Sequence, residues 1–122
     1  MNKIIIFESA TDSLRTFARL MAEGFQEIGY QVLMADMNRE TQTRTEIYAF
    51  AKPGNTAALF FNHAGLNLLT ESRASIWNEL EIDCYDFIVD HPMYYHAALI
   101  FPIQKLTFLC VDEYHQKFIE RF

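Results

Sequence analysis

The sequence has few of the features that mark secreted, disulfide-linked or membrane-spanning proteins. Its two cysteines, Cys84 and Cys110, lie far apart, and each stands among apolar residues. This pattern disfavours a disulfide scaffold, a redox pair and a zinc ribbon, and it predicts two buried thiols in a reducing cytosol. No apolar run approaches the roughly 20 residues that a membrane-spanning helix requires. Only four apolar residues, Ile4 to Phe7, precede Glu8, too few for the core of a signal peptide, so we expect a cytoplasmic protein.

Positive charge is scarce as well. The chain has 10 lysines and arginines against 16 acidic residues, a formal net charge of -6, and its basic residues are scattered. Such a chain repels a phosphate backbone, so nucleic acid is not an expected partner. Its 122 residues, 51% of them apolar, suffice for one compact domain with a sizeable core.

Short apolar segments alternate with segments of helical periodicity along the whole chain. The expected strands are 4–7, 31–35, 57–61, 87–89 and 106–111, and the expected helices are 14–28, about 43–51, 72–80 and 112–122, with one helical turn after Pro92. Because no hairpin dipeptide such as Asn-Gly joins the strands, each crossover should lead to a parallel neighbour. The sequence therefore predicts an α/β fold, a doubly wound, Rossmann-like three-layer domain with a five-stranded parallel sheet.

Glycine is missing from the turn after the first strand, Ser9 to Ser13. The dinucleotide-binding fingerprint needs glycines there so that a pyrophosphate can approach the backbone, which argues against NAD or FAD. The hydroxyls of Ser9, Thr11 and Ser13 at a helix N-terminus suit a phosphate or a sugar hydroxyl, although Asp12 places a negative charge where a phosphate would sit. Ordinary capping of the helix explains the same residues equally well.

Polar side chains gather at one expected edge of the sheet. Ligands of open parallel sheets bind beyond the carboxyl ends of the strands, and each strand here turns polar at that end. The side chains at this edge are Ser9 to Ser13, Asp36 to Asn38, Asn62, His63, Asp90, His91, Asp112 and His115. A surface or capping role explains each histidine taken singly. Their convergence on one edge favours a binding site.

The segment Asp90 to His96 is the most unusual part of the sequence. His91 can act as a general base because imidazole titrates near neutral pH, and Asp90 can orient it. Tyr94 and Tyr95 can stack on a sugar or a nucleobase. A structural turn, in which Asp90 caps a helical turn, remains an alternative. His91 and His96 are five residues apart, whereas a metal-binding pair on a helix needs a spacing of three or four, so no metal is expected.

Two segments carry a family resemblance. Ile88 to His96, which contains Asp-His-Pro, and Leu109 to His115, which contains Cys-Val-Asp-Glu-Tyr-His, resemble the amino-terminal half of bacterial glycosyltransferases of the two-Rossmann-domain (GT-B) type. The spore-maturation-protein-like group is the most similar within that type. The likeness spans essentially the whole chain, but only these two segments are distinctive.

The resemblance implies half of an enzyme. In such proteins two similar domains face each other across a cleft, and the amino-terminal one shapes the acceptor side. The expected partners are a sugar, glycan or protein acceptor and a carboxyl-terminal Rossmann-like domain of the same protein. That second domain would hold the nucleotide-sugar donor, so no cofactor is expected in residues 1–122, and this domain alone should not transfer sugar. His91 would be the catalytic base, with Asp90 as the second choice. The residues expected to bind substrate are Ser9, Thr11, Ser13, Asn62, His63, Tyr94, Tyr95, His96, Asp112 and His115.

Other functions are compatible with the same fold. A flavodoxin-like module would bind a small ligand or a flavin phosphate at Ser9 to Ser13 and stack Tyr94 or Tyr95 on the ring. A non-catalytic interaction domain is a further alternative, because the pattern of the last helix reaches Phe122 without a C-cap signal, as in a domain cut from a longer protein. A signalling receiver is excluded, because Asn62 and Asp112 stand where its aspartate and lysine are required.

Overall fold

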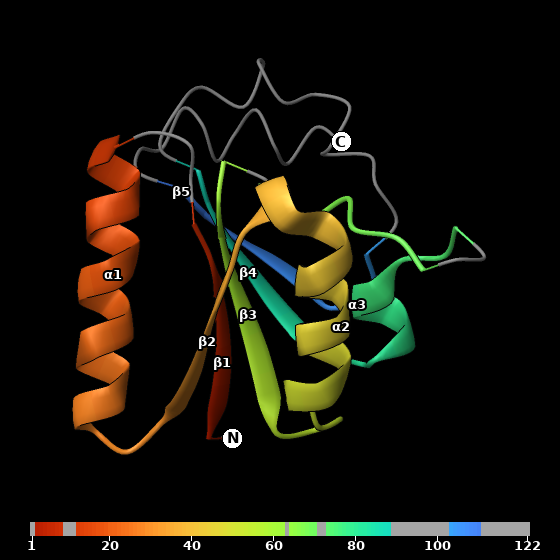
Figure 1. Cartoon of the computed structure of the whole chain (residues 1–122), viewed down its shortest axis with the longest axis horizontal. Coiled ribbons are helices and arrows are strands. Elements are labelled where there is room, and N and C mark those ends of the chain that lie inside the picture. The colour runs from red at the N-terminus through yellow and green to blue at the C-terminus, as the bar shows by residue number, and fades with distance from the viewer. Residues whose placement is uncertain (1, 9–11, 63, 71–72, 89–102, 111–122) are drawn as a thin grey trace.

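The computed structural model describes residues 2–8, 12–62, 64–70, 73–88 and 103–110 (Figure 1). The strands are β1 (Lys3–Phe7), β2 (Gln31–Ala35), β3 (Thr56–Phe61), β4 (Asp83–Ile88) and β5 (Leu106–Cys110). The helices are α1 (Asp12–Glu27), α2 (Glu40–Phe50) and α3 (Ile76–Glu79), and a short 3₁₀ helix, η1 (Met37–Arg39), leads from β2 into α2. None of the helices in these ranges has the length and apolar character needed to cross a bilayer.

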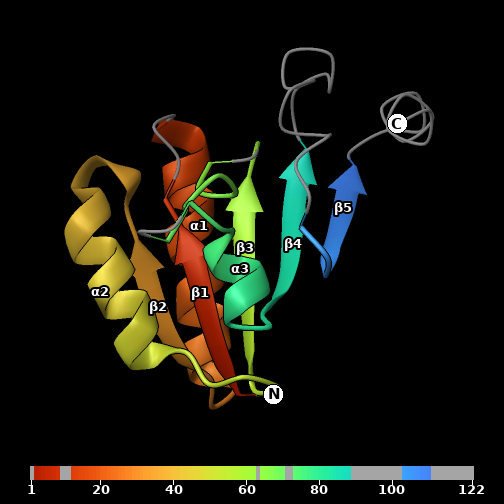
Figure 2. The ribbon, with the colours of Figure 1, turned by 90° about the vertical axis from the view of Figure 1, so that its right-hand side faces the viewer.

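The five strands are parallel and follow the order β2-β1-β3-β4-β5. Helix α1 lies on one face of the sheet, and α2 and α3 lie on the other (Figure 1, Figure 2). Right-handed crossovers require this arrangement, because the chain moves one way along the sheet from β1 to β2 and the opposite way from β2 to β3 and β4. The predicted doubly wound α/β fold with a five-stranded parallel sheet is confirmed. The direction of winding reverses between β1 and β3, and such a switch point is where ligands of these sheets bind.

Each face of the sheet buries its own apolar cluster. On the side of α2 and α3, the rings of Phe7 and Phe60 stack with their centroids 5.2 Å apart, and both meet the indole of Trp77 edge-on at 5.6 Å and 5.1 Å. All three side chains are at most 1% exposed. On the side of α1, the small residues Ala18 and Ala22 are buried and allow the helix to approach β1 and β2 closely. The centre of the sheet is therefore rigidly packed beneath its carboxyl edge.

Helix α1 ends as the sequence predicts. Gly29 has a φ of 99°, and its N–H and that of Tyr30 donate to the carbonyls of Gln26 and Phe25, at 3.1 Å and 2.9 Å. This pair of bonds is a Schellman motif, which satisfies carbonyls that the end of a helix leaves unpaired. Strand β2 begins at Gln31, directly after this turn.

The apolar stripe of α1 that faces the sheet consists of Leu14, Ala18, Met21, Ala22 and Phe25. Other large apolar residues of the expected helix 14–28 are exposed: Phe17 is 49% exposed, Leu20 60% and Ile28 70%. At 3.6 residues per turn, Phe17 lies about 100° around the helix from Ala18, and Ile28 follows the last residue of α1. Phe17 keeps one ring contact, edge-on to Phe61 at 5.8 Å.

Two elements begin four residues away from the sequence prediction, and α2 begins at Glu40 rather than at about residue 43. Strand β4 begins at Asp83 rather than at residue 87. The sequence pattern missed the first part of the strand because Asp83 and Asp86 interrupt the apolar run that marks the other strands. Helix α3 begins at Ile76 rather than at residue 72, because Ser75 is its N-cap and accepts a hydrogen bond from the N–H of Asn78. The described residues directly before that cap, Arg73 and Ala74, are not helical, and an isolated antiparallel bridge pairs Leu69 with Ser75.

Candidate functional site

A cavity of about 330 Å³ lies at the carboxyl edge of the sheet. Its lining residues come from the segments that follow β1, β2 and β3 and from the first half of α1: Glu8, Arg15, Arg19, Asp36, Met37, Asn38 and Ala64. The cavity thus lies beside β1, where the direction of winding reverses. Its size is at the lower end of the range, about 300–1,000 Å³, that small-molecule sites occupy.

The wall that follows β2 is fixed by hydrogen bonds around Asp36. The Asp36 carboxylate caps η1 by accepting from the N–H of Asn38 at 2.9 Å. The hydroxyl of Thr43, which is only 2% exposed, donates to the carbonyl of Asp36 at 2.7 Å. A side chain in the first turns of α2 therefore holds the end of β2, and with it the Asp36 carboxylate, in place.

The wall that α1 contributes carries two arginines, Arg15 and Arg19, one helical turn apart. The Nε of Arg19 donates to the Glu8 carboxylate at 3.1 Å. Glu8 is itself anchored, because its backbone N–H donates to the carbonyl of Ala35 at 2.9 Å. The Glu8 side chain thus joins α1 to the ends of β1 and β2.

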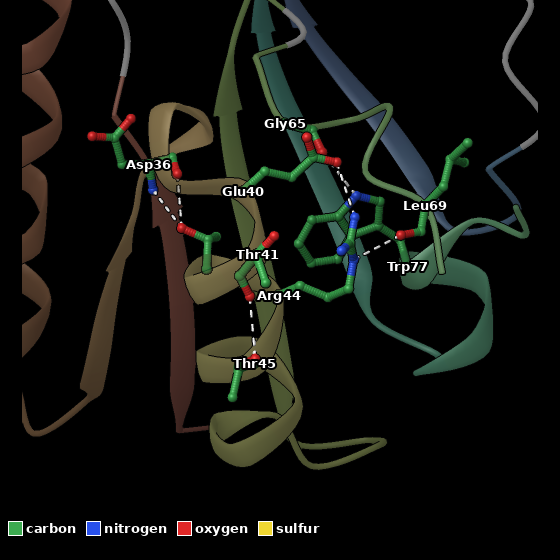
Figure 3. A network of polar contacts seen from close by, with 9 residues as sticks. Asp36, Glu40, Thr41, Arg44, Thr45, Gly65, Leu69 and Trp77 are labelled. Carbon is green, nitrogen blue, oxygen red and sulfur yellow. Dashed lines mark hydrogen bonds and ion pairs between the residues drawn. The ribbon is translucent and has the colours of Figure 1, made fainter. Parts of the chain in front are cut away.

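The third wall is the loop after β3, which turns back sharply at Gly65. This residue has a φ of 100°, and a Cβ placed there would lie 2.5 Å from a ring carbon of Phe7. The indole Nε1–H of Trp77 donates to the Gly65 carbonyl at 3.1 Å (Figure 3). The close packing of Gly65 against Phe7 and the hydrogen bond from Trp77 fix this loop. Ala64, the residue before Gly65, lines the cavity.

Arg44 of α2 holds the same loop further along the chain. Its Nε donates to the carbonyl of Leu69 at 2.9 Å, and its Nη2 lies 2.9 Å from a carboxylate oxygen of Glu40 (Figure 3). The carbonyl bond ties the loop to α2. The ion pair between residues spaced four apart on the helix orients the guanidinium.

Two ionisable groups of β4, Cys84 near its amino end and Asp86 further along, are buried in the sheet. Cys84 is a free thiol, and burial raises its pKa, helped by the negative charges of Asp83 and Asp86. The expectation of a buried thiol is confirmed for Cys84, whereas the side chain of Cys110 is outside the described residues. Asp86 is fully buried. Among the residues that the structure describes, no three His, Cys, Asp or Glu side chains are placed to hold a metal ion.

Most of the residues singled out from the sequence lie outside the described part of the chain. These are Ser9, Thr11, His63, Asp90, His91, Tyr94, Tyr95, His96, Asp112 and His115, together with the side chain of Ser13. Their proposed roles stay predictions. Asn62 is described: it follows β3 in the left-handed region, with a φ of 49°, and its N–H donates to the carbonyl of Phe87. It is at the expected edge but does not line the cavity.

The sequence interpretation assigned no role to several residues that line the cavity. Glu8, Arg15, Arg19 and Ala64 belong to this group. For Arg15 and Arg19, the sequence does contain a signal that predicts their place beside the cavity. They stand four residues apart, just after the first strand and off the apolar stripe of α1, so both lie on one side of the helix near the carboxyl edge.

Comparison with protein-family models, with curated proteins and with solved structures finds no match to this chain. The class of the protein is therefore defined by its fold, a doubly wound α/β domain with a polar cavity at the switch point of the sheet.

Proposed function

We propose that this chain is the acceptor-side, amino-terminal domain of a nucleotide-sugar-dependent glycosyltransferase and that its cavity binds a sugar unit of the acceptor. The observation that carries the proposal is the polar cavity at the carboxyl edge, lined by carboxylate, amide and guanidinium groups. The sequence resemblance of the Asp-His-Pro and Asp-Glu-Tyr-His segments supports the same function.

The lining residues suit the chemistry of a sugar. Ring hydroxyls both donate and accept hydrogen bonds, and a site for them needs acceptors and donors side by side. Asp36 supplies acceptor oxygens, the Asn38 side chain supplies both kinds of group, and Met37 offers an apolar surface for the C–H face of a ring. The backbone turn that holds these three residues is fixed, so little ordering is needed when a ligand binds.

Transfer itself requires groups beyond this cavity. The proposal assigns the role of general base to His91 and that of its orienting carboxylate to Asp90, on the sequence alone. A donor-binding domain would supply the nucleotide sugar. In an enzyme that contains both domains, His91→Ala should sharply reduce turnover without unfolding the protein, and unchanged turnover would remove His91 from the mechanism.

The binding step can be tested on this chain. Saturation-transfer NMR with a panel of hexoses should detect binding, and a nucleotide sugar should show none, because its site is assigned to the other domain. Asn38→Ala should weaken hexose binding several-fold, because it removes the amide side chain and leaves the backbone cap of Asp36 intact. Gln26→Ala, which removes an exposed amide at the far end of α1, is the matched control and should change nothing. Equal affinities for the two variants would exclude the cavity as the sugar site.

One observation favours a second function, a flavodoxin-like module that binds a flavin. The strand order β2-β1-β3-β4-β5 is the one that flavodoxin has, with its flavin at the switch point between β1 and β3. Titration with FMN separates the two functions. A flavin-binding module should quench the flavin fluorescence at micromolar concentration, whereas the glycosyltransferase domain should leave the emission unchanged.

A further inference from the structure

The cavity has two chemically different walls. One, from α1, carries the guanidinium groups of Arg15 and Arg19. The other, after β2, carries Asp36 and Asn38, which suit neutral hydroxyls. A neutral hexose would satisfy the second wall alone. The guanidinium groups of the first wall are therefore the feature that can distinguish one class of sugar from another.

Arg19 is held in a way that leaves part of its guanidinium available. Its Nε is used by Glu8, at 3.1 Å, and within the described part of the chain no other partner of Arg19 is recorded. Toward the residues that the structure describes, the Nη1 and Nη2 groups keep their donors. Two parallel N–H groups of this kind match the two oxygens of a carboxylate or phosphate. The Glu8 bond also limits the motion of a side chain that is otherwise 63% exposed.

Two neighbouring features add to the positive character of this wall. Arg15 stands one turn nearer to the N-terminus of α1 and lines the same cavity. The first turn of this 16-residue helix also carries the positive end of the helix dipole. Both features favour a negative group of the ligand on the α1 side of the cavity, and the acidic Asp12 in the same first turn acts against them.

The remaining charges argue against a simple anion as the ligand. Two carboxylates, Glu8 and Asp36, balance the two arginines, so the lining residues have no net formal charge. An inorganic anion would gain from the guanidinium groups but would be repelled by the carboxylates, and it has no sugar hydroxyls to offer to Asp36 and Asn38. A ligand with hydroxyls at one end and an oxyanion at the other fits both walls.

We infer, on the basis of the sugar-binding role proposed above, that the cavity selects acidic sugars, whose carboxylate or phosphate pairs with Arg19 while ring hydroxyls bind Asp36 and Asn38. Charge-assisted hydrogen bonds contribute about 1.5–3 kcal/mol, which corresponds to about tenfold or more in affinity. An acidic sugar should therefore bind at least about tenfold more tightly than its neutral counterpart.

The test is a titration of this chain, at constant ionic strength, with glucose, glucuronate, glucose 6-phosphate and inorganic phosphate. Glucuronate and glucose 6-phosphate distinguish a carboxylate from a phosphate as the preferred group, and at least one of them should bind about tenfold more tightly than glucose. Arg19→Gln should bring the ratio of acidic to neutral affinity close to one. Lys105→Gln, which removes a positive charge just before β5 and away from the cavity lining, should preserve the ratio.

The outcomes separate the inference from the proposed function. If glucose and the acidic sugars bind equally, the inference fails and the sugar-binding role stands. If none of the sugars binds, both fail. If inorganic phosphate binds as tightly as glucose 6-phosphate, the cavity is an anion site and the inference is overturned. An unchanged ratio in Arg19→Gln would also overturn it, because another group would then recognise the acid.

Discussion

The close approach of Gly65 to Phe7 predicts how much an added methyl group should cost at this position. Gly65 and Gly29 have nearly the same backbone conformation, with φ values of 100° and 99°, but different surroundings. A Cβ at Gly29 would meet nothing within 4 Å, whereas one at Gly65 would lie 2.5–2.7 Å from three atoms of the Phe7 ring. Gly29→Ala therefore measures the backbone cost alone, and Gly65→Ala measures that cost plus the clash.

The magnitudes follow from these two terms. The left-handed conformation costs a residue with a Cβ about 1–2 kcal/mol, which is the expected loss of unfolding free energy for Gly29→Ala. Forcing a methyl group against a well-packed ring adds about 1–3 kcal/mol, so Gly65→Ala should lose about 2–5 kcal/mol. The Phe7 ring has little room to move, because it is fully buried between Phe60 and Trp77.

Urea unfolding of both variants measures the difference. Fluorescence reports on Trp77, the single tryptophan of the chain, and far-UV circular dichroism provides a second probe. A Phe7→Leu background should reduce the extra cost of Gly65→Ala, because the smaller side chain relieves the clash. Equal losses for Gly65→Ala and Gly29→Ala would refute the reasoning, since the Phe7 ring would then accommodate the methyl group freely.

Two further predictions concern the buried thiol and the loop after β3. Since burial raises the pKa of Cys84, this thiol should resist Ellman's reagent at mildly alkaline pH in a Cys110→Ser variant until the protein unfolds, and fast native-state labelling would contradict its burial. The protonated Cys84 thiol contributes its full stability below the pKa of about 8.5 that a thiol has in the unfolded chain, and this contribution is lost as the pH rises above that value. The unfolding free energy of Cys84→Ala should therefore decline less at alkaline pH than that of the unmodified chain. Arg44→Met should lower the unfolding free energy by about 1–2 kcal/mol, because it leaves the partly buried carbonyl of Leu69 unpaired. Glu40→Gln breaks only the half-exposed ion pair and should cost at most about 0.5 kcal/mol, and equal urea midpoints for these two variants would contradict the assigned roles.

The fold was predictable because its signals are local. Apart from Gln31, the runs 4–7, 31–35 and 57–61 are apolar along their length, and they match β1, β2 and β3 to within one residue at each end. Gly29 marked the end of α1 because only a residue without a Cβ takes that conformation cheaply. The start of β4 escaped prediction because Asp86 is a polar residue in a buried strand position, which a sequence pattern cannot distinguish from a loop.

The candidate site was predictable only in its position. The polar ends of the strands indicated the carboxyl edge, and Asp36 to Asn38 do line the cavity there. The contributions of Arg15 and Arg19 depend on how α1 is rotated against the sheet, and that rotation is set by the burial of Ala18 and Ala22 rather than by the arginines themselves. The pairing of Arg19 with Glu8 joins residues eleven positions apart and follows from the same rotation.

The central claim is that the cavity beside β1 is where this protein binds a sugar. An amide map of the ¹⁵N-labelled chain, recorded as an acidic or neutral hexose is added, tests it most directly. The account predicts saturable shifts centred on Glu8, Asn38 and Ala64, with the amino end of the sheet around Asn55 unmoved. Saturable shifts centred on any other surface, or an unperturbed spectrum with every sugar, would contradict it.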